Sequence, residues 1–378
     1  MRIAWFTHSL VSDWNHGNAH FLRGVLAELI VRGHDAVAWE PADGWSRANL
    51  REQSPGAEAA FARRFPTLVS HTYAGEQDLD RALDGADLAV VHEWTDPGIV
   101  RAIGRRRAHG GRFTLLFHDT HHRAVSAPDE MAAYDLSAYD GVLAFGEALR
   151  EVYLRRGWGR RVWTWHEAAD TRLFRPRPDI ATEGDPDGDT VWIGNWGDDE
   201  RSAELETFLI GPAEAAGASL DVHGVRYPPA ALERLARAGA RYRGWIANAD
   251  VPGVFAHHRM TVHVPRRFYV TALPGVPTIR VFEALACGIP LISAPWEDIE
   301  GLFRPGEDFL VARTGSEAEA HMRLLKNDRG ARHEIAASGL ERIRARHSCA
   351  HRVDELFNLL LRIGAPQPAA KSKEGEPA

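Results

Sequence analysis

Glu283 is the residue whose type and surroundings most clearly predict a chemical role. It lies in the segment TIRVFEALACGIP (278–290) and is the only acidic residue between Asp250 and Glu297. A carboxylate among apolar residues needs a partner, because its burial without one is costly. It can accept hydrogen bonds from two O–H groups at once, so the hydroxyl pair of a nucleotide ribose is a suitable partner. The alternative interpretation is an acid that complements the dipole at the start of a helix.

Sequence signals also delimit the helix that positions Glu283. Its apolar residues predict a helix, Gly288 and Pro290 end it, and a short buried strand follows. The rest of the chain alternates between short apolar runs and amphipathic stretches, which is typical of an α/β fold with parallel sheets. We expect strands at 3–7, 36–39, 88–92, 113–118 and 142–145, and a second series at 191–196, 220–224, 260–264, 290–293 and 309–312.

Two domains are expected along the chain. The segment 176–189 is rich in Pro, Gly and acidic residues, which is the composition of a linker. Ligands of doubly wound sheets bind beyond the carboxyl ends of the strands, so the facing strand ends of two such domains would form a cleft. We predict a Rossmann-like domain at 1–175, the linker at 176–189, a second Rossmann-like domain at 190–348, a C-terminal helix at 349–364 and a disordered tail at 365–378.

Composition limits the classes of function. The length of 378 residues suits two domains. A net charge of −7 gives no overall basic field, so nucleic-acid binding is not expected. The two cysteines, Cys287 and Cys349, cannot form a disulfide framework, which suits a reducing cytosol. The N-terminus lacks the pattern of a signal peptide, and no apolar run is long enough for a transmembrane helix. We therefore expect a cytoplasmic protein.

The segment RVFEALACGIP (280–290) resembles the nucleotide-sugar signature of two-domain (GT-B) glycosyltransferases. It is most similar to the group-1, family-4-like branch that includes the CgeB-type spore-maturation proteins. Supporting pieces follow in matching order: Gly17 and Asn18 after the first strand, the segment IGNW (193–196), and the segment GWIANADVP (244–252). The resemblance covers almost the whole chain, although only 280–290 is specific.

The resemblance implies a metal-independent, hexosyltransferase-like enzyme whose second domain binds a nucleotide diphosphate-sugar as substrate, without a cofactor. It implies that Glu283 binds the ribose hydroxyls and that the loop carrying Trp245 receives the base. Retention of configuration is the outcome it favours. The implied donor-binding residues are Gly194, Asn195, Arg201, Trp245, Arg266, Arg267, Gly275, Arg280, Glu283 and Gly288.

The chain departs from the family pattern at Gly275. Many retaining members carry a second glutamate at this position, eight residues before the one matching Glu283, whereas here no acid occurs from 251 to 282. Glycine permits a close approach of the backbone, so this loop could present N–H groups to the sugar or phosphate instead. Inversion therefore remains open.

Arginines are the expected contacts of a donor diphosphate, since the first lysine is Lys326. The planar guanidinium matches phosphate oxygens bidentately. Arg266 and Arg267 follow a predicted strand and so lie at its carboxyl end, while Arg201 follows the segment GNWG (194–197). Ordinary surface arginines are the alternative interpretation.

The first domain is expected to hold the acceptor, a sugar, glycan or small molecule. His118 and Asp119 end a predicted strand, and His titrates near neutral pH. Asp13 follows the first strand and could act as a base in an inverting enzyme. A structural hydrogen-bonding role is the alternative for each of these three catalytic candidates. The expected cleft residues of this domain are Gly17, Asn18, His20 and Glu93.

Other site types are disfavoured. The segment HDTHH (118–122) contains metal-ligand types, but adjacent histidines rarely point at one ion. The segment DPDGD (185–189) lies in the predicted linker and lacks the final glutamate of a calcium loop. No phosphate-binding loop, dinucleotide fingerprint or hydrolase elbow occurs. The alternatives to a glycosyltransferase are a sugar-nucleotide epimerase and a non-catalytic sugar-nucleotide-binding or scaffold protein.

Overall fold

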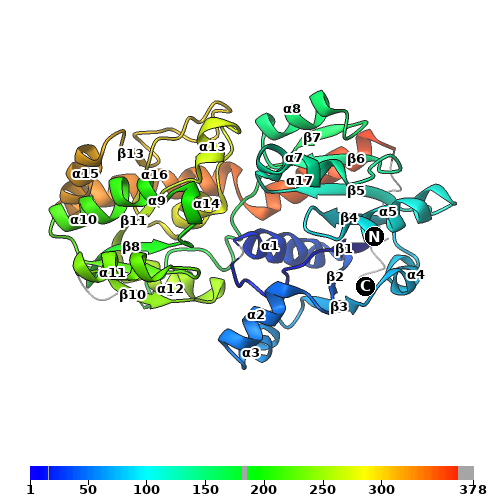
Figure 1. Cartoon of the computed structure of the whole chain (residues 1–378), viewed down its shortest axis with the longest axis horizontal. Helices are drawn as coiled ribbons and strands as arrows, with labels where there is room; N and C mark the ends of the chain where they lie inside the picture. Colours follow the sequence, from blue (N-terminus) through cyan, green and yellow to red (C-terminus); the bar gives the residue numbers. More distant parts are fainter. Residues whose placement is uncertain (16, 181–184, 365–378) are drawn as a thin grey trace, which may run out of the picture.

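The computed structural model describes residues 1–15, 17–180 and 185–364. It contains two α/β domains side by side, each built on a parallel sheet (Figure 1). The predicted disordered tail at 365–378 and four residues of the predicted linker lie outside the described residues. The predicted fold class, two doubly wound Rossmann-like domains, is confirmed.

The N-terminal domain has a seven-stranded sheet in the order β3-β2-β1-β4-β5-β6-β7. Its strands β1 and β4 to β6 are almost wholly buried, as expected when helices cover both faces of a parallel sheet. The strands are β1 (Arg2–Phe6), β2 (Asp35–Pro41), β3 (Val69–Tyr73), β4 (Leu88–His92), β5 (Thr114–Asp119), β6 (Gly141–Ala144) and β7 (Val162–Thr164). The helices are α1 (Asn18–Val31), α2 (Trp45–Gln53), α3 (Ala57–Arg64), α4 (Leu79–Leu83), α5 (Pro97–Ala108), α6 (Arg123–Ser126), α7 (Pro128–Ala132) and α8 (Glu147–Arg156).

The C-terminal domain has a six-stranded sheet in the order β10-β9-β8-β11-β12-β13. Its strands are β8 (Gly188–Ile193), β9 (Leu220–His223), β10 (Arg241–Gly244), β11 (His258–His263), β12 (Leu291–Ser293) and β13 (Leu310–Val311). Its helices are α9 (Ser202–Leu205), α10 (Gly211–Ala215), α11 (Pro229–Arg237), α12 (Val251–Ala256), α13 (Arg267–Thr271), α14 (Ile279–Cys287), α15 (Gly315–Asn327) and α16 (Arg329–Arg346).

The helix that carries Glu283 is α14, and it is buried on nearly all sides. Every one of its residues except Arg280 is buried. Gly288 ends it in the left-handed conformation, with φ +66°, and a Cβ there would be in ordinary contact with Pro176 and Leu340. A helix that is apolar all round belongs in a core, so the single acid on α14 is forced into the interior of the molecule.

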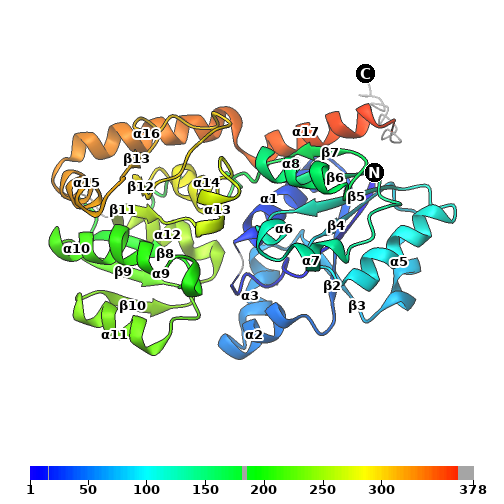
Figure 2. The same ribbon diagram turned by 45° about the horizontal axis from the view of Figure 1, so that its top comes forward.

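The last helix, α17 (Cys349–Arg362), returns to the N-terminal domain and packs against α1. Figure 2 shows α16 over the C-terminal domain and α17 over the N-terminal one. The indole N–H of Trp165 donates to the carbonyl of Arg352 at 2.8 Å, and Arg32 pairs with Asp354 at 2.6 Å. The chain therefore crosses between the domains twice, and the second crossing helps hold them together.

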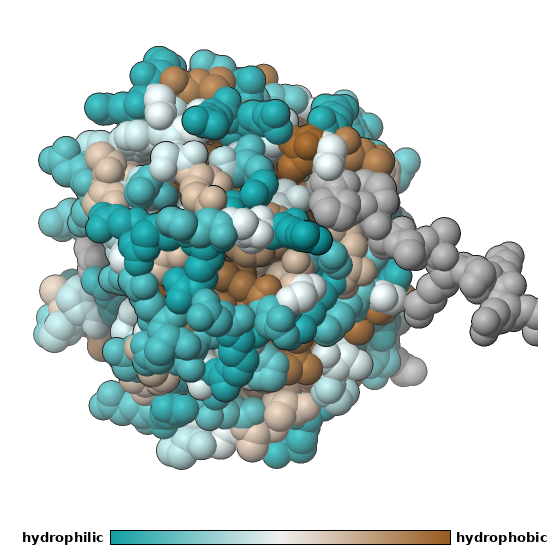
Figure 3. All heavy atoms as spheres, turned by 90° about the vertical axis from the view of Figure 1, so that its right-hand side faces the viewer, coloured by the Kyte–Doolittle hydropathy of each residue, from teal (hydrophilic) through white to brown (hydrophobic). Residues whose placement is uncertain are grey.

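Where its residues are described, the outer face of the N-terminal domain is mostly polar. Figure 3 shows this face as mainly hydrophilic, with small, scattered hydrophobic areas. Within the described residues, no helix combines the length and apolar composition needed to cross a bilayer. Cys287 and Cys349 are both buried and free.

Candidate functional site

The carboxyl ends of the two sheets face each other across two cavities that share lining residues. The central cavity has a volume of about 410 Å³, and the adjoining cavity, next to Asn248, has about 80 Å³. Asn15, Gly17, Gly194, Asn195 and Arg280 line both. Strand ends of a doubly wound sheet are where ligands bind, so these cavities form the candidate site.

The two domains touch closely at the floor of the central cavity. A Cβ atom on Gly17 would lie 2.5 Å from Cγ2 of Ile279, the first residue of α14. Asn195 donates a side-chain hydrogen bond to Asn15 across the interface, and the backbone N–H of Asn248 donates to Asp13 at 3.1 Å. The structure is therefore that of a closed pair of domains.

Glu283 lies beneath the cavities and is completely buried. It does not belong to the described residues that line either cavity. One oxygen, Oε1, accepts from the Asn248 amide at 2.6 Å, and the other forms an ion pair with Arg280, which itself lines both cavities. Burial raises the pKa of Glu283, and the positive charge of Arg280 opposes that shift. Its role at the ribose stays a prediction that requires Arg280 or Asn248 to move.

His20 belongs to the same buried cluster. Its Nε2 accepts from the backbone N–H of Asp170 at 2.8 Å, so the proton of a neutral ring lies on Nδ1, which is 3.5 Å from Oε1 of Glu283. Burial, with the nearby charges of Arg280 and Arg23, lowers the pKa of His20 to about 3. The neutral ring can donate toward Glu283 without bringing in a charge.

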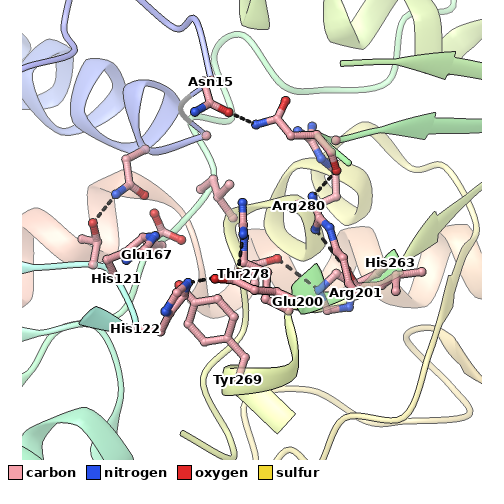
Figure 4. Close-up of a pocket in the computed structure, with 18 of the residues that line it drawn as sticks. Asn15, His121, His122, Glu167, Glu200, Arg201, His263, Tyr269, Thr278 and Arg280 are labelled. Carbon is pink, nitrogen blue, oxygen red and sulfur yellow. Dashed lines mark hydrogen bonds and ion pairs between the residues drawn. The ribbon is translucent and has the colours of Figure 1, made fainter. Parts of the chain in front are cut away.

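Arg201, Arg226, Arg266 and Arg280 of the C-terminal domain line the central cavity, as Figure 4 shows in part. Arg201 donates to the backbone carbonyls of Asn195 and Val264, at 2.5 and 3.2 Å. Arg266 pairs with Glu200, and Arg280 pairs with Glu283. These contacts fix the guanidinium groups of Arg201, Arg266 and Arg280 along one wall of the cavity, where they can receive an anion.

Glu200 and His122 connect the domains at the edge of this wall. His122 Nε2 lies 3.5 Å from Glu200 Oε2. Burial favours the neutral form of Glu200, but hydrogen bonds from His122 and Arg266 outweigh it and lower the pKa of Glu200 to about 2. The ring of His122 stacks on Phe268 with 4.9 Å between centroids, which orients it.

A second buried histidine, His263, holds the residue that precedes α14 in place. His263 Nδ1 faces Ser293 Oγ at 3.0 Å and its Nε2 faces Thr278 Oγ1 at 3.1 Å. Since the Ser293 hydroxyl donates to Ala294 at 2.9 Å, it accepts from His263, and Thr278 then donates to Nε2. Burial lowers the pKa of His263 to about 3. This neutral relay holds Thr278 at the N-terminus of α14, facing the central cavity.

Glu167 is the carboxyl that the N-terminal domain contributes to the central cavity. It follows β7 and is 2% exposed. The backbone N–H of Ile279 donates to it, while Oε1 has no hydrogen-bond partner among the described residues. Burial, and then the charge of Glu283, raise the pKa of Glu167 well above its usual value. In Figure 4 it lies between His121 and the residues around Thr278.

The structure brings several predicted residues to the cavities. Gly17, Asn18, Gly194, Asn195, Arg201, Arg266 and Arg280 line the central cavity, and Trp245 lines the adjoining one. Asn18 donates to Thr120 in the loop after β5. Trp245 also faces a lateral cavity of about 510 Å³ beneath α2 and α3.

The three catalytic candidates lie elsewhere than the central cavity, as far as the described residues go. Asp13 lines the adjoining and lateral cavities and pairs with Arg23 at 2.9 Å. His118 is buried against Trp5 and Trp165, and burial lowers its pKa to about 3. Asp119 accepts from the Tyr153 hydroxyl at 2.6 Å, and burial raises its pKa to about 6. The contacts of His118 and Asp119 are those of structural residues, and their catalytic roles remain predictions.

Four further predicted residues also lie outside the described lining of the central cavity. Glu93 is fully buried beside Arg123, 3.3 Å away. Arg267 pairs with Glu204 on the surface at 3.0 Å. Gly275 has φ +85°, and a Cβ there would lie 2.3 Å from Ile299. Gly288 serves as the cap of α14.

Sequence reasoning missed four polar lining residues that carry much of the geometry: Glu167, Glu200, His263 and Thr278. Thr278 precedes a predicted helix and His263 lies near the end of a predicted strand, so these positions could have marked both residues as site candidates. Glu167 follows β7, a three-residue strand that the pattern did not reveal. Within the described part of the chain, no group of three or more His, Cys, Asp or Glu is arranged to hold a metal ion.

Comparison with known proteins finds similarity in both sequence and fold. Residues 201–358 match the sequence model of a family described as glycosyl transferase-like. This range contains the arginines of the central cavity, α14 and Glu283. No curated protein matches the chain in a sequence comparison.

Solved structures of similar fold cover nearly the whole chain. Anabaena Alr3699/HepE, in complex with UDP and glucose, has a TM-score of 0.67 at 15% identity, covering 96% of this chain and 99% of that one. Sucrose-phosphate synthase from Thermosynechococcus elongatus has a TM-score of 0.64 at 16% identity, covering 97% and 99%. An alpha-glucosyltransferase in complex with UDP has a TM-score of 0.66 at 11% identity, covering 96% and 100%. The chain therefore has the two-domain GT-B fold.

Proposed function

We propose that this protein is a glycosyltransferase that moves a sugar from a nucleotide diphosphate-sugar to an acceptor. The observation that carries the proposal is the wall of Arg201, Arg266 and Arg280 beside the first turn of α14 in the central cavity. Arginine forks and a helix N-terminus both favour phosphate. The glycosyl transferase-like match over 201–358 and the complexes of similar proteins with UDP or UDP-glucose support the same activity.

The donor binds mainly to the C-terminal domain in this proposal. The diphosphate lies along the arginine wall, and the nucleoside extends toward the adjoining cavity, where Trp245 and Asn248 lie. Glu283 then receives the ribose hydroxyls once Asn248 or Arg280 gives way. The buried network around Glu283 makes that exchange reasonable, because the carboxylate trades existing hydrogen bonds for others of the same kind.

The acceptor binds to the N-terminal domain. Trp45, Trp94 and His121 line that side of the central cavity, and aromatic faces suit the apolar face of a sugar ring or of an aromatic acceptor. Closure of the two domains excludes water from the reacting groups. The contacts across Gly17 and Ile279 are those expected of such a closed state.

The reaction proceeds without a metal ion and with retention in this proposal. The acceptor oxygen bonds to the anomeric carbon as the bond from that carbon to the phosphate oxygen breaks. The nucleoside diphosphate leaves with the electron pair and takes the acceptor proton. The arginine wall stabilises the charge that develops on the phosphate, which is the task a metal ion would otherwise perform. We also propose that the protein is cytoplasmic. The resemblance of the segment 280–290 supports the further proposal that it is related to the CgeB-type branch.

Turnover tests this function. The purified protein is incubated with UDP-, GDP- and dTDP-sugars and a broad set of acceptors, while nucleotide release and nucleotide binding are both measured. Sugar transfer with release of the diphosphate is the expected result. Conversion of the sugar with the nucleotide still attached would indicate an epimerase. Binding without any reaction across the panel would indicate a non-catalytic protein and contradict the proposal.

A further inference from the structure

Glu167 has a hydrogen-bonding capacity that the protein leaves unused. It is 2% exposed and lines the central cavity, yet its Oε1 has no partner among the described residues. Buried polar atoms are almost always hydrogen-bonded, so an exception calls for a reason. A ligand group that completes the bond is such a reason when the residue belongs to a cavity wall, as Glu167 does here. Oε1 itself is covered in this structure, so the side chain must turn slightly to meet the ligand.

The chemistry of that ligand group follows from the carboxyl itself. The ionised carboxyl only accepts hydrogen bonds and repels the oxygens of a phosphate, whereas the neutral form, which the raised pKa of Glu167 favours, can also donate through its O–H. A hydroxyl group both donates and accepts, so it can pair with either form. The opposite wall, with Arg201, Arg266 and Arg280, is the part of the cavity that suits phosphate. Glu167 is therefore set to meet a hydroxyl group that lies next to a bound diphosphate.

The position of Glu167 identifies which hydroxyl this is. Its carboxyl accepts from the backbone N–H of Ile279, one residue from Arg280 and from Thr278. In a nucleotide diphosphate-sugar, the groups next to the diphosphate are the ribose on one side and the transferred sugar on the other. In the proposed function the nucleoside extends toward the adjoining cavity, which Trp245 and Asn248 line, and this leaves the transferred sugar for Glu167.

The other acids of the site are already engaged. Glu283 is fully buried and bound to Asn248 and Arg280. Glu200 also lines the central cavity, but it pairs with Arg266 and faces His122. Gly275 cannot readily be replaced by an acid, since a side chain there would be strained at φ +85° and would meet Ile299. Among the described residues, Glu167 is thus the carboxyl of the central cavity with a buried, unpartnered oxygen.

We propose that Glu167 is a specificity-determining residue whose Oε1 forms a hydrogen bond with a hydroxyl group of the sugar carried by the donor. This inference rests on the proposed function, because it assumes a nucleotide-sugar in the central cavity. Glu167 belongs to the N-terminal domain, whereas the arginine wall belongs to the C-terminal one. The transferred sugar therefore bridges the two domains, which free nucleoside diphosphate cannot do through this residue.

The test variant is Glu167→Gln, which keeps the shape of the side chain. Its carbonyl must turn toward the N–H of Ile279, so its NH₂ group faces the cavity and the acceptor is lost. Glu151→Gln, on the exposed surface of α8, is the matched control. The probes are UDP-, GDP- and dTDP-glucose and the three free diphosphates, with binding measured by titration calorimetry.

The expected result separates the sugar from the nucleotide. Glu167→Gln weakens binding of the nucleotide-sugar roughly 2- to 10-fold, the range for a hydrogen bond between neutral groups. Binding of the matching free diphosphate stays unchanged, and Glu151→Gln alters neither. Equal losses for both ligands, or no loss for either, would overturn the inference about Glu167.

Deoxy analogues of the glucose group identify the hydroxyl through a double-mutant cycle. Removal of the partner hydroxyl should weaken binding to the wild-type protein and cost nothing further in Glu167→Gln. If each deoxy analogue loses the same affinity in the wild-type protein as in Glu167→Gln, Glu167 does not bind a sugar hydroxyl. Should Glu167→Gln fail to fold, Glu167→Asp, which withdraws the carboxylate by one CH₂ group, undergoes the same cycle. A wild-type protein that binds none of the six probes would instead contradict the proposed function.

Discussion

At the scale of single residues, the site depends on buried groups whose charge is controlled by their partners. Glu283 pairs with Arg280, which opposes the rise that burial causes in its pKa, whereas His20 and His263 are kept neutral by burial. The neutral histidines can donate or accept hydrogen bonds without adding charge to the interior. The arginines remain the positive groups that a diphosphate would meet.

Removal of the Glu283 carboxylate should weaken both binding and folding. In Glu283→Ala, Arg280 and Asn248 lose their acceptor, so the guanidinium no longer has a fixed position in the cavity. We expect donor binding to fall by about 1.5–3 kcal/mol, the value of hydrogen bonds to a charged group. Titration calorimetry measures this, and thermal unfolding reports the accompanying loss of stability. If the variant folds and its donor affinity is unchanged, Glu283 does not contribute to donor binding.

His118 should make stability depend on pH. Burial lowers its pKa to about 3, below the ordinary value of a histidine in the unfolded chain. Its contribution is therefore present above pH 6.5 and is lost as the pH falls from there toward 3. His118→Phe removes the titrating group but keeps an aromatic ring beside Trp5 and Trp165.

We expect the unfolding free energy of His118→Phe to fall less than that of the wild type between pH 7 and pH 5. The difference should be about 2 kcal/mol, from about 1.4 kcal/mol per pKa unit. Urea denaturation at the two pH values measures it. Parallel pH profiles for the two proteins would show that His118 is accessible to protons in the native state.

At the scale of elements, the loop between β11 and α13 decides which of two neighbouring arginines faces the ligand. The sequence predicts diphosphate contacts for both Arg266 and Arg267, but only Arg266 is among the described residues of the central cavity. Arg267 opens α13 and pairs with Glu204 on the surface. Arg266→Ala should weaken binding of UDP, or of the diphosphate that the panel identifies, by roughly tenfold or more. Arg267→Ala is the matched control. Equal losses of diphosphate affinity in the two variants would show that Arg267 also contacts the ligand.

The strands that could be predicted from the sequence are those that form short apolar runs. All ten predicted strands overlap observed ones, while β3, β7 and β10 were missed. β3 and β10 are edge strands with mostly exposed or half-buried residues, and β7 has only three residues. The same cause explains the site: Glu283 stood out inside an apolar helix, whereas Glu167 follows the unseen β7. The three catalytic candidates were chosen from strand ends, but strand position alone does not say which side chains turn toward the other domain.

At the scale of the whole molecule, the site exists only while the domains are closed. The central cavity takes residues from both sheets, and Asn15, Asn195, His122 and Glu200 meet across it. The second crossing of the chain through α16 and α17 ties the C-terminal domain to α1. Closure is therefore a property of the interface. A change of one methyl group at a close contact between the domains can test it.

Gly17→Ala is that change, because its new Cβ would lie 2.5 Å from Cγ2 of Ile279. The β-branched side chain of Ile279 is stiff, and overpacking of this kind costs about 1–3 kcal/mol, which the domains can relieve by opening. We expect a larger radius of gyration by small-angle X-ray scattering and a lower kcat, with each domain still folded by circular dichroism. The double variant Gly17→Ala/Ile279→Ala removes the clashing methyl group and should regain the closed dimensions. An unchanged radius and turnover in Gly17→Ala would show that the contact between Gly17 and Ile279 does not control closure.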